Sequence, residues 1–294
     1  MDSAPPDPTF VASLLTRCSF PPPHTSVTIA VSGGPDSMAL MCLAVAHGLH
    51  VTAVHVDHGL RDDSHRDVML ITPVARALGV QLQVRRVTVE PGPNLEARAR
   101  AARYGVMPDD VMTGHTADDQ AETVLINLLR GAGGTGLAAM SPGPRRPILG
   151  LRRSETHRLC ADIGIECVND STNDSPVHQR NRVRHELLPL ISDISRRDPV
   201  PIFVRTADVL RDDEALLDEL SAAIDPTDAR ALSTAPLPLA RRAVRAWLAD
   251  PYPPDQATVE RVLEVARGDH PGCDIGGNRQ IRRSKQRLSI VNLG

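Results

Sequence analysis

The chain has 294 residues, enough for one large domain or two modest ones, each with a buried core. Its net charge of −3 excludes a strongly basic wrapper of nucleic acid, although local basic patches remain compatible with RNA binding. No apolar run reaches the length of a membrane span and no signal sequence opens the chain, so we expect a cytoplasmic protein without a membrane partner.

Cations and cysteines narrow the expected chemistry further. Among 33 basic residues Lys285 is the one lysine. Arginine must therefore make nearly all cationic contacts, and its planar guanidinium group suits phosphate. The five cysteines include no Cys-x-x-Cys pair, which argues against a zinc ribbon or a redox dithiol. Composition leaves the oligomeric state open, a homodimer included.

The first strong pattern is a strand, a glycine turn and a helix. Residues 27–31 read as a short buried strand, and a helix runs through residues 38–45, capped by Asp36 or Ser37. The intervening Gly33 and Gly34 allow close backbone approach, and N–H groups at a helix start favour an anion, most naturally phosphate. It is not a Walker A loop, since no Gly-Lys-Ser/Thr follows. An ordinary strand–turn–helix is the alternative.

Strands and helices then alternate. Further strands are predicted at 51–56, 80–89 and 111–113, and helices at 63–78, 94–104 and 118–130. A repeat of roughly 30 residues is typical of βαβ units, so we expect an α/β fold with a parallel Rossmann-like sheet and helices on both faces. Ligands of such sheets bind at the carboxyl ends of the strands. Polar clusters follow three of the predicted strands, at 32–37, 57–61 and 114–122.

The third cluster is acidic. Asp118 is placed to cap the predicted helix, and Asp119 and Glu122 are three residues apart, on one helical face. The pair suits a cation, either a metal ion or the ammonium of an amine; a cap and a solvated face are the alternative. Four glycines in residues 131–136 then predict a flexible loop near a ligand.

Two groups of basic residues are candidate phosphate contacts. Arg180, Arg182 and Arg184 would share one face of an extended segment, whereas in a helix only Arg180 and Arg184 would. After a break at 196–201, helices are predicted at 203–224, 239–248 and 256–267, followed by a hairpin at 279–291. That hairpin carries five cations and no acidic residue, which favours contact with a nucleic-acid backbone over a merely solvated strand. They are Arg279, Arg282, Arg283, Lys285 and Arg287.

Several ordered motifs carry a family resemblance. Residues 32–37, Ser-Gly-Gly-Pro-Asp-Ser, resemble the loop of the N-type ATP pyrophosphatases, the PP-loop superfamily. Collinear motifs over residues 27–190 resemble one branch of it, the tRNA(Ile)-lysidine synthetases. These motifs are Asp57-His58-Gly59-Leu60-Arg61, Asn94-Leu95-Glu96-Ala97-Arg98, Gly114-His115 through Thr123 to Gly136-Leu137, Arg146-Pro147-Ile148-Leu149, Asp170-Ser171-Thr172-Asn173-Asp174 and Arg180-Asn181-Arg182-Val183-Arg184-His185.

The resemblance implies a two-step ligation. The C2 oxygen of the wobble cytidine in the minor isoleucine tRNA, anticodon CAU, attacks the α-phosphate of ATP, and lysine then displaces AMP to give lysidine. Residues 1–195 would form the adenylation domain, and residues 196–294 a small tRNA-binding domain, helical with a C-terminal hairpin.

The resemblance also implies roles for individual residues. Asp36 would bind Mg²⁺ and act in catalysis with His115, while Asp119 and Glu122 would bind the L-lysine substrate. The ATP-binding residues would be Ser32, Gly33, Gly34, Pro35, Asp36, Ser37, His58, Arg98 and Arg184. The tRNA-binding residues would be Arg180, Arg182, Arg282 and Arg283.

Two rival functions remain. One is 2-thiolation of tRNA by another PP-loop enzyme, although the missing Cys-x-x-Cys pair counts against it. The other is a non-catalytic RNA-binding relative, against which the intact 32–37 loop and the acidic pair count.

Overall fold

The computed structural model describes residues 7–57, 64–87, 98, 102, 105–168 and 178–293. The chain divides into two compact units, Met1–Asp208 and Val209–Gly294. Each unit has its own hydrophobic core and is described by itself.

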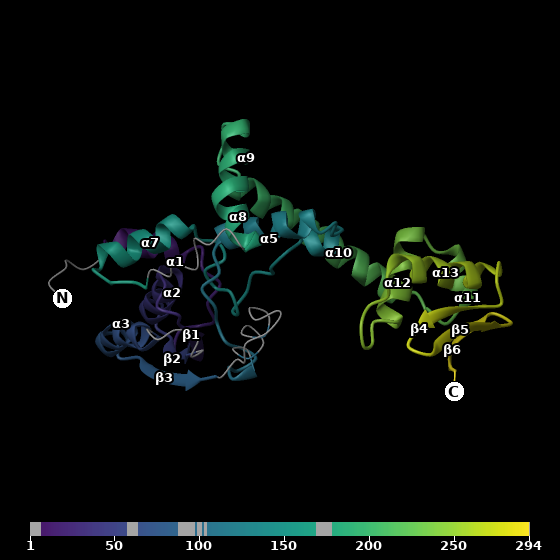
Figure 1. The fold of residues 1–294 in the computed structure, drawn as a ribbon, viewed down its shortest axis with the longest axis horizontal. Helices are drawn as coiled ribbons and strands as arrows, with labels where there is room; N and C mark the ends of the chain where they lie inside the picture. The colour runs from purple at the N-terminus through teal and green to yellow at the C-terminus, as the bar shows by residue number, and fades with distance from the viewer. Residues whose placement is uncertain are drawn as a thin grey trace. The chain divides into compact units, whose positions relative to one another are not determined.

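The N-terminal unit is built on a parallel sheet with the order β1-β2-β3 (Figure 1). The strands are β1 (Ser26–Ala30), β2 (His50–Asp57) and β3 (Gln81–Arg86). The strand predicted at 111–113 is reduced to a parallel bridge between Ile29 and Met112. The Ala30 N–H donates to the Met112 carbonyl at 2.9 Å, so this segment extends the sheet beyond β1. The predicted α/β class is confirmed.

Helices flank this sheet, and several helices of the unit were not predicted, among them α6 (Gly134–Leu137), which overlaps the segment 131–136 expected to be a flexible loop. Helix α7 lies beside α2, and its polar sequence gave little periodic signal (Figure 1). Between α8 and α9 the chain forms a π-helix, Val183–Leu187, a feature often found at functional sites. Helices assigned to this unit or starting in it are α1 (Pro8–Leu15), α2 (Pro35–Ala46), α3 (Ser64–Ala77), α5 (Ala117–Leu129), α6 (Gly134–Leu137), α7 (Arg153–Asp162), α8 (Gln179–Arg182), α9 (Leu188–Ser195) and α10 (Val200–Ala222).

Both faces of the sheet are covered. On one face Ile29 and Ala53 pack with residues of α2, α3 and α7, including Met38, Ile71 and Leu159. On the other, Val54 and Val56 pack against Met107 and Val111. Strand β2 is buried on both sides over residues 53–56, and three of these four residues are apolar because neither face of the strand meets water there.

A third core holds α5 in place. Ala121 and Leu125 of α5 pack with Val183, Leu188 and Val200. This packing fixes α5 against α8 and the π-helix. The side of α5 that carries the acidic pair is therefore held beside the arginines of those two elements.

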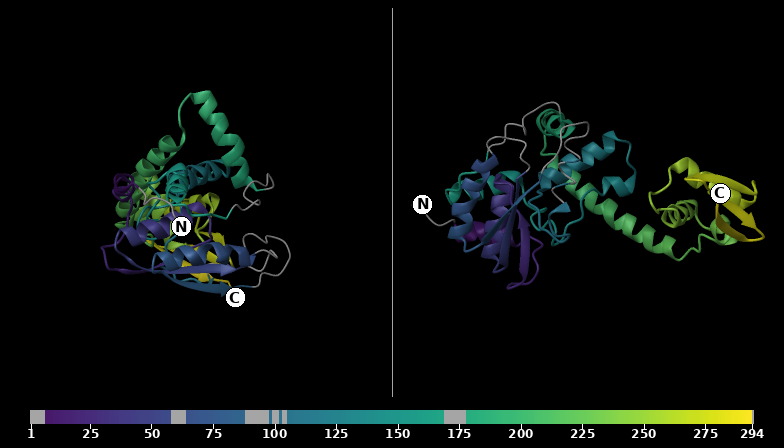
Figure 2. Two further views of the ribbon diagram at one scale, coloured as in Figure 1. Left: turned by 90° about the vertical axis from the view of Figure 1, so that its left-hand side faces the viewer. Right: turned by 60° about the horizontal axis from the view of Figure 1, so that its bottom comes forward.

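The C-terminal unit combines the end of α10 and three further helices with an antiparallel sheet of order β4-β5-β6, shown from two further sides in Figure 2. The tail expected to form a hairpin forms β5 and β6, and β4 adds an unpredicted third strand. Its elements are α11 (Ala229–Thr234), α12 (Leu237–Trp247), α13 (Gln256–Arg267), β4 (Gly272–Gly276), β5 (Arg279–Ser284) and β6 (Arg287–Asn292). Across the described residues, no helix combines the length and apolar character needed for a membrane crossing.

Candidate active site

The loop at 32–37 connects β1 to α2 and is held by its own serines. The Ser37 hydroxyl donates to the Gly34 carbonyl at 2.9 Å and accepts from the Ser32 N–H at 3.2 Å. The predicted cap at Asp36 or Ser37 is wrong, because Gly34 is the N-cap and Pro35 occupies the first turn. Proline suits that position because its missing N–H has no helical partner there. Asp36 and Ser37 are thereby left inside the first turn.

Two glycines let other segments approach this loop. Gly33 has φ +84°, and a Cβ built on it would lie 2.5 Å from Val168 Cγ2. A Cβ on Gly114 would lie 2.9 Å from the carbonyl oxygen of Asp36. Alanine fits neither position without movement, so these glycines allow the loop and the end of the 111–113 segment to meet.

Asp36 is held by a residue of α7. The Thr156 hydroxyl, fully buried, shares its single proton between Asp36 Oδ1 and the Arg153 carbonyl oxygen, which lies 2.8 Å away. Burial raises the pKa of Asp36 above its usual value, and the Thr156 hydrogen bond opposes that rise. The carboxylate of the loop is therefore oriented but poorly neutralised, as suits a group that receives a cation.

The acidic pair lies at the start of α5. The N-cap is Thr116 and not Asp118, which corrects the sequence prediction. Asp119 Oδ2 accepts from the Thr116 N–H at 2.8 Å, forming a capping box. Asp119 therefore uses one carboxylate oxygen for the helix and directs the other, Oδ1, into the site.

Three guanidinium groups surround this pair. Asp119 Oδ1 accepts from Arg153 and from Arg180, both at 3.0 Å. Glu122, which is fully buried, accepts four N–H bonds: one from Arg153 at 3.0 Å, one from Arg180 at 2.7 Å and two from Arg184 at 2.7 and 3.1 Å. Burial raises the pKa of Asp119, but the guanidinium groups of Arg153 and Arg180 outweigh it, and the net pKa lies below the usual value.

Arg153 links this cluster to the loop. Its Nε lies 3.7 Å from Asp36 Oδ2, while its terminal nitrogens bond to Asp119 and Glu122. Burial lowers the pKa of Arg153, and the three carboxylates reverse this effect so that it stays protonated. Asp36, Asp119, Glu122, Arg153, Arg180 and Arg184 thus form one cluster of three carboxylates and three guanidinium groups, formally neutral.

Arg153 and Thr156 were not predicted from the sequence as site residues. Arg152-Arg153 reads as a solvated cationic pair, and nothing in the sequence near it indicates carboxylates 31 to 34 residues away. The Arg152-x-x-Glu155 spacing was one usable signal for the start of α7. The Glu155 side chain accepts from the Arg152 N–H at 2.8 Å, as the third helical residue does in a capping box.

The other predicted site residues are dispersed. Arg180 and Arg184 share the inner face, as the helical alternative predicted, whereas Arg182 points outward and pairs with Glu186 at 2.8 Å. His115 lies just before α5, with Nδ1 2.7 Å from the Thr113 hydroxyl. Arg98 is exposed. His58 lies outside the described residues.

In the C-terminal unit the predicted tRNA contacts differ in environment. Arg282 is exposed on β5, and Lys285 is exposed in the turn between β5 and β6. The Arg283 guanidinium instead donates to the backbone carbonyls of Lys285 at 3.0 Å and Val265 at 3.4 Å. Arg287 pairs with Asp225 at 2.7 Å. The cationic strands therefore divide into exposed cations and cations that hold the unit together.

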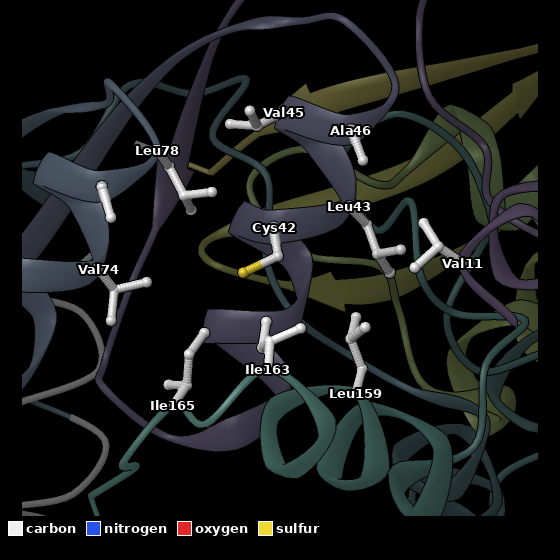
Figure 3. A pocket seen from close by; sticks show the side chains of 11 residues that line it. Val11, Cys42, Leu43, Val45, Ala46, Val74, Leu78, Leu159, Ile163 and Ile165 are labelled. Carbon is white, nitrogen blue, oxygen red and sulfur yellow. The ribbon is translucent and has the colours of Figure 1, made fainter. Parts of the chain in front are cut away.

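A separate apolar cavity of about 380 Å³ lies between α1, α2, α3 and α7 (Figure 3). Among its lining residues Cys42 carries the only polar side-chain atom, and burial raises the pKa of this thiol to about 12. The cavity offers neither charge nor hydrogen bonds to a phosphate or an ammonium group. It therefore contributes nothing to the site at Asp36.

Two regions of this chain match known protein families. Residues 9–191 match the family model described as "PP-loop domain", and residues 228–289 match "TilS substrate binding domain". Against a known structure, the U34-tRNA thiolase NcsA of Methanococcus maripaludis, the TM-score is 0.57 at 14% identity, covering 69% of this chain and 80% of that one. At that identity the likeness concerns the fold alone.

Curated relatives share a higher sequence identity with this chain. The chain is 44% identical over 273 residues to the tRNA(Ile)-lysidine synthase of Nocardia farcinica, covering 86% of each chain. It is 43% identical over 242 residues to that of Rhodococcus erythropolis, covering 77% of this chain and 74% of the relative. With a PP-loop followed by a TilS substrate-binding region, the chain belongs to the tRNA(Ile)-lysidine synthase family.

Proposed function

We propose that this chain ligates lysine to C2 of the wobble cytidine of the minor isoleucine tRNA with anticodon CAU, forming lysidine through an adenylated cytidine. Family membership motivates the proposal. The observation that carries it is Arg153, which joins Asp36 of the PP-loop to the Asp119–Glu122 pair in one cluster. A nucleotide over the loop and an amine at the pair would be neighbours.

The first step is adenylation. The cytidine C2 oxygen attacks the α-phosphorus of ATP. The bond from the α-phosphorus to the oxygen that bridges it to the β-phosphorus breaks, and pyrophosphate leaves with the electron pair. Backbone N–H groups of Gly33, Gly34, Asp36 and Ser37 would bind phosphate, since Pro35 has no N–H and the Ser32 N–H donates to Ser37. Arg184, Arg98 and His58 stay predicted nucleotide contacts.

Asp36 fits a metal as a single carboxylate ligand. In the described part of the chain no group of three or more His, Cys, Asp and Glu side chains could hold a metal ion. Mg²⁺ ordinarily binds one or two carboxylates together with substrate phosphates, which matches a lone, oriented Asp36. When bound there, the ion would neutralise charge on the departing pyrophosphate.

The second step transfers lysine. The ε-ammonium group first loses a proton to water, and the resulting ε-amine attacks C2. The bond from C2 to the adenylate oxygen breaks, AMP leaves with the electron pair, and the attacking nitrogen loses a further proton. Asp119 and Glu122 would hold lysine through its ammonium groups, and His115 would accept the proton. The 2.7 Å contact between Thr113 Oγ1 and His115 Nδ1 supports this role because it orients the ring.

The two parts of the chain would divide the work. Residues 1–195 would carry adenylation, and residues 196–294 would bind tRNA in the cytoplasm. Exposed Arg282 suits direct contact with RNA phosphate. Arg283, Arg180 and Arg182 stay predicted contacts, although Arg283 also supports the fold of its unit.

The test is a transfer assay with labelled lysine, ATP and a transcript of the CAU isoleucine tRNA. We expect acid-stable label in RNA, lost in Asp36→Ala. Sulfur incorporation without dependence on lysine would instead identify a thiolating enzyme. RNA binding without any turnover of ATP would identify a non-catalytic relative.

A further inference from the structure

The carboxylates assigned to lysine are already satisfied without it. Glu122 accepts four N–H bonds and has no exposed surface, and both oxygens of Asp119 are engaged. An ammonium group arriving here finds cations rather than open acceptors. Lysine therefore needs at least one guanidinium group to withdraw.

Charge determines when that withdrawal is favourable. The six-residue cluster is formally neutral, so an added ammonium group alone leaves excess positive charge in a largely buried site, at an electrostatic cost. Phosphates added alone leave excess negative charge. Both together restore balance, with guanidinium groups on the phosphates and ammonium groups on the carboxylates.

Arg153 is the residue placed to make this exchange. Of the three arginines, it alone forms an ion pair with Asp36 among the described residues, at 3.7 Å. Its backbone N–H is fixed on Asp118 Oδ2 at 2.8 Å, so the side chain moves about a fixed base. Its terminal nitrogens bond to the carboxylates on one side, and its Nε faces the nucleotide loop on the other.

We propose that Arg153 is a positioning residue that couples the two small substrates: it blocks the Asp119–Glu122 pair until nucleotide phosphates attract its guanidinium group. This inference rests on the proposed function, which assigns lysine to that pair. It makes nucleotide and lysine bind with positive, reciprocal coupling, because each supplies the counter-charge that the other displaces.

Removing Arg153 leaves both carboxylates paired. Glu122 keeps its bonds to Arg180 at 2.7 Å and to Arg184 at 2.7 and 3.1 Å. Asp119 keeps Thr116 at 2.8 Å and Arg180 at 3.0 Å. Arg153→Gln is therefore expected to fold, and a thermal melt checks this. A suitable control is Arg152→Gln, which removes the neighbouring guanidinium group from Asp118 and leaves the acidic pair untouched.

The experiment is calorimetric titration of lysine into the full chain, with and without Mg²⁺ and the non-cleavable analogue α,β-methylene-ATP. In the wild type we expect the analogue to tighten lysine binding by roughly tenfold or more, with the same factor in the reciprocal titration. In Arg153→Gln, lysine should bind more tightly without nucleotide, and the factor should fall below about threefold. Arg152→Gln should keep the wild-type factor.

Equal lysine affinity with and without the analogue, or no detectable lysine binding in either state, overturns the coupling. So does an unchanged coupling factor in a folded Arg153→Gln. Failure of the proposed function is recognised separately, because the wild type would then transfer no labelled lysine to the tRNA transcript. If the wild type transfers lysine to the tRNA but nucleotide does not change its affinity for lysine, the inference about Arg153 is refuted and the proposed function stands.

Discussion

Replacing Glu122 by glutamine tests the buried cluster most sharply. The change keeps the shape of the side chain but removes its charge and turns one acceptor oxygen into an N–H donor. Four N–H bonds, at 2.7 to 3.1 Å, converge on the two oxygens of Glu122. Glutamine can accept at one oxygen only, so the donors facing its amide nitrogen lose their partner.

The magnitude follows from those lost bonds. Each charge-assisted hydrogen bond contributes roughly 1.5–3 kcal/mol, and breaking a buried ion pair costs roughly 3–5 kcal/mol. We therefore expect Glu122→Gln to lower the free energy of unfolding of the N-terminal unit by about 3–5 kcal/mol. For a unit of this size that corresponds to a fall in Tm of roughly 6–20 °C.

Circular dichroism melts measure that fall. Trp247, the one tryptophan of the chain, belongs to the C-terminal unit, so its fluorescence follows that unit in the same sample. A matched control is Glu186→Gln, which changes an exposed carboxylate paired with Arg182 and should leave the melt unchanged. If Glu122→Gln melts together with the control, the guanidinium bonds to Glu122 are not made in solution.

Three further predictions concern the loop and its support. Gly33→Ala places a Cβ 2.5 Å from Val168 Cγ2 at φ +84°, so ATP affinity measured by calorimetry should fall at least roughly tenfold. Thr156→Val removes the hydroxyl bonded to Asp36 and should slow pyrophosphate release roughly tenfold, whereas Thr156→Ser should retain most of the rate. Because the folded pKa of Asp119 lies below 3.8, the unfolded chain binds more protons in acid. Tm of the N-terminal unit should therefore decline as pH falls below about 5, although protonation of Asp36, whose pKa burial raises, opposes this.

Local signals explain what the sequence predicted correctly. Helix α13 has the predicted bounds, Gln256–Arg267, because Asp255 caps its start and Gly268, at φ +95°, ends it. The pairing of Arg180 with Arg184 on one face followed from helical periodicity alone. Both features depend on residues within one or two turns of each other.

Long-range contacts explain what the sequence did not predict. Helix α7 has a polar sequence, and Arg153 acquires its role only when folding brings Asp36, Asp119 and Glu122 to it. The acidic pair was recognised, but the three arginines that satisfy it lie in segments distant along the chain. The state of the pair without substrate is a property of tertiary packing.

Ordered transfer of the ATP α-phosphate is the reaction at the centre of the proposed function. Wild-type protein is incubated with [α-³²P]ATP, Mg²⁺ and the CAU isoleucine tRNA transcript without lysine, and lysine is then added. We predict that label enters the tRNA first and is discharged as AMP when lysine is added. Absence of label from the tRNA, or label that lysine does not discharge, would contradict adenylation of the wobble cytidine as the step that this site performs.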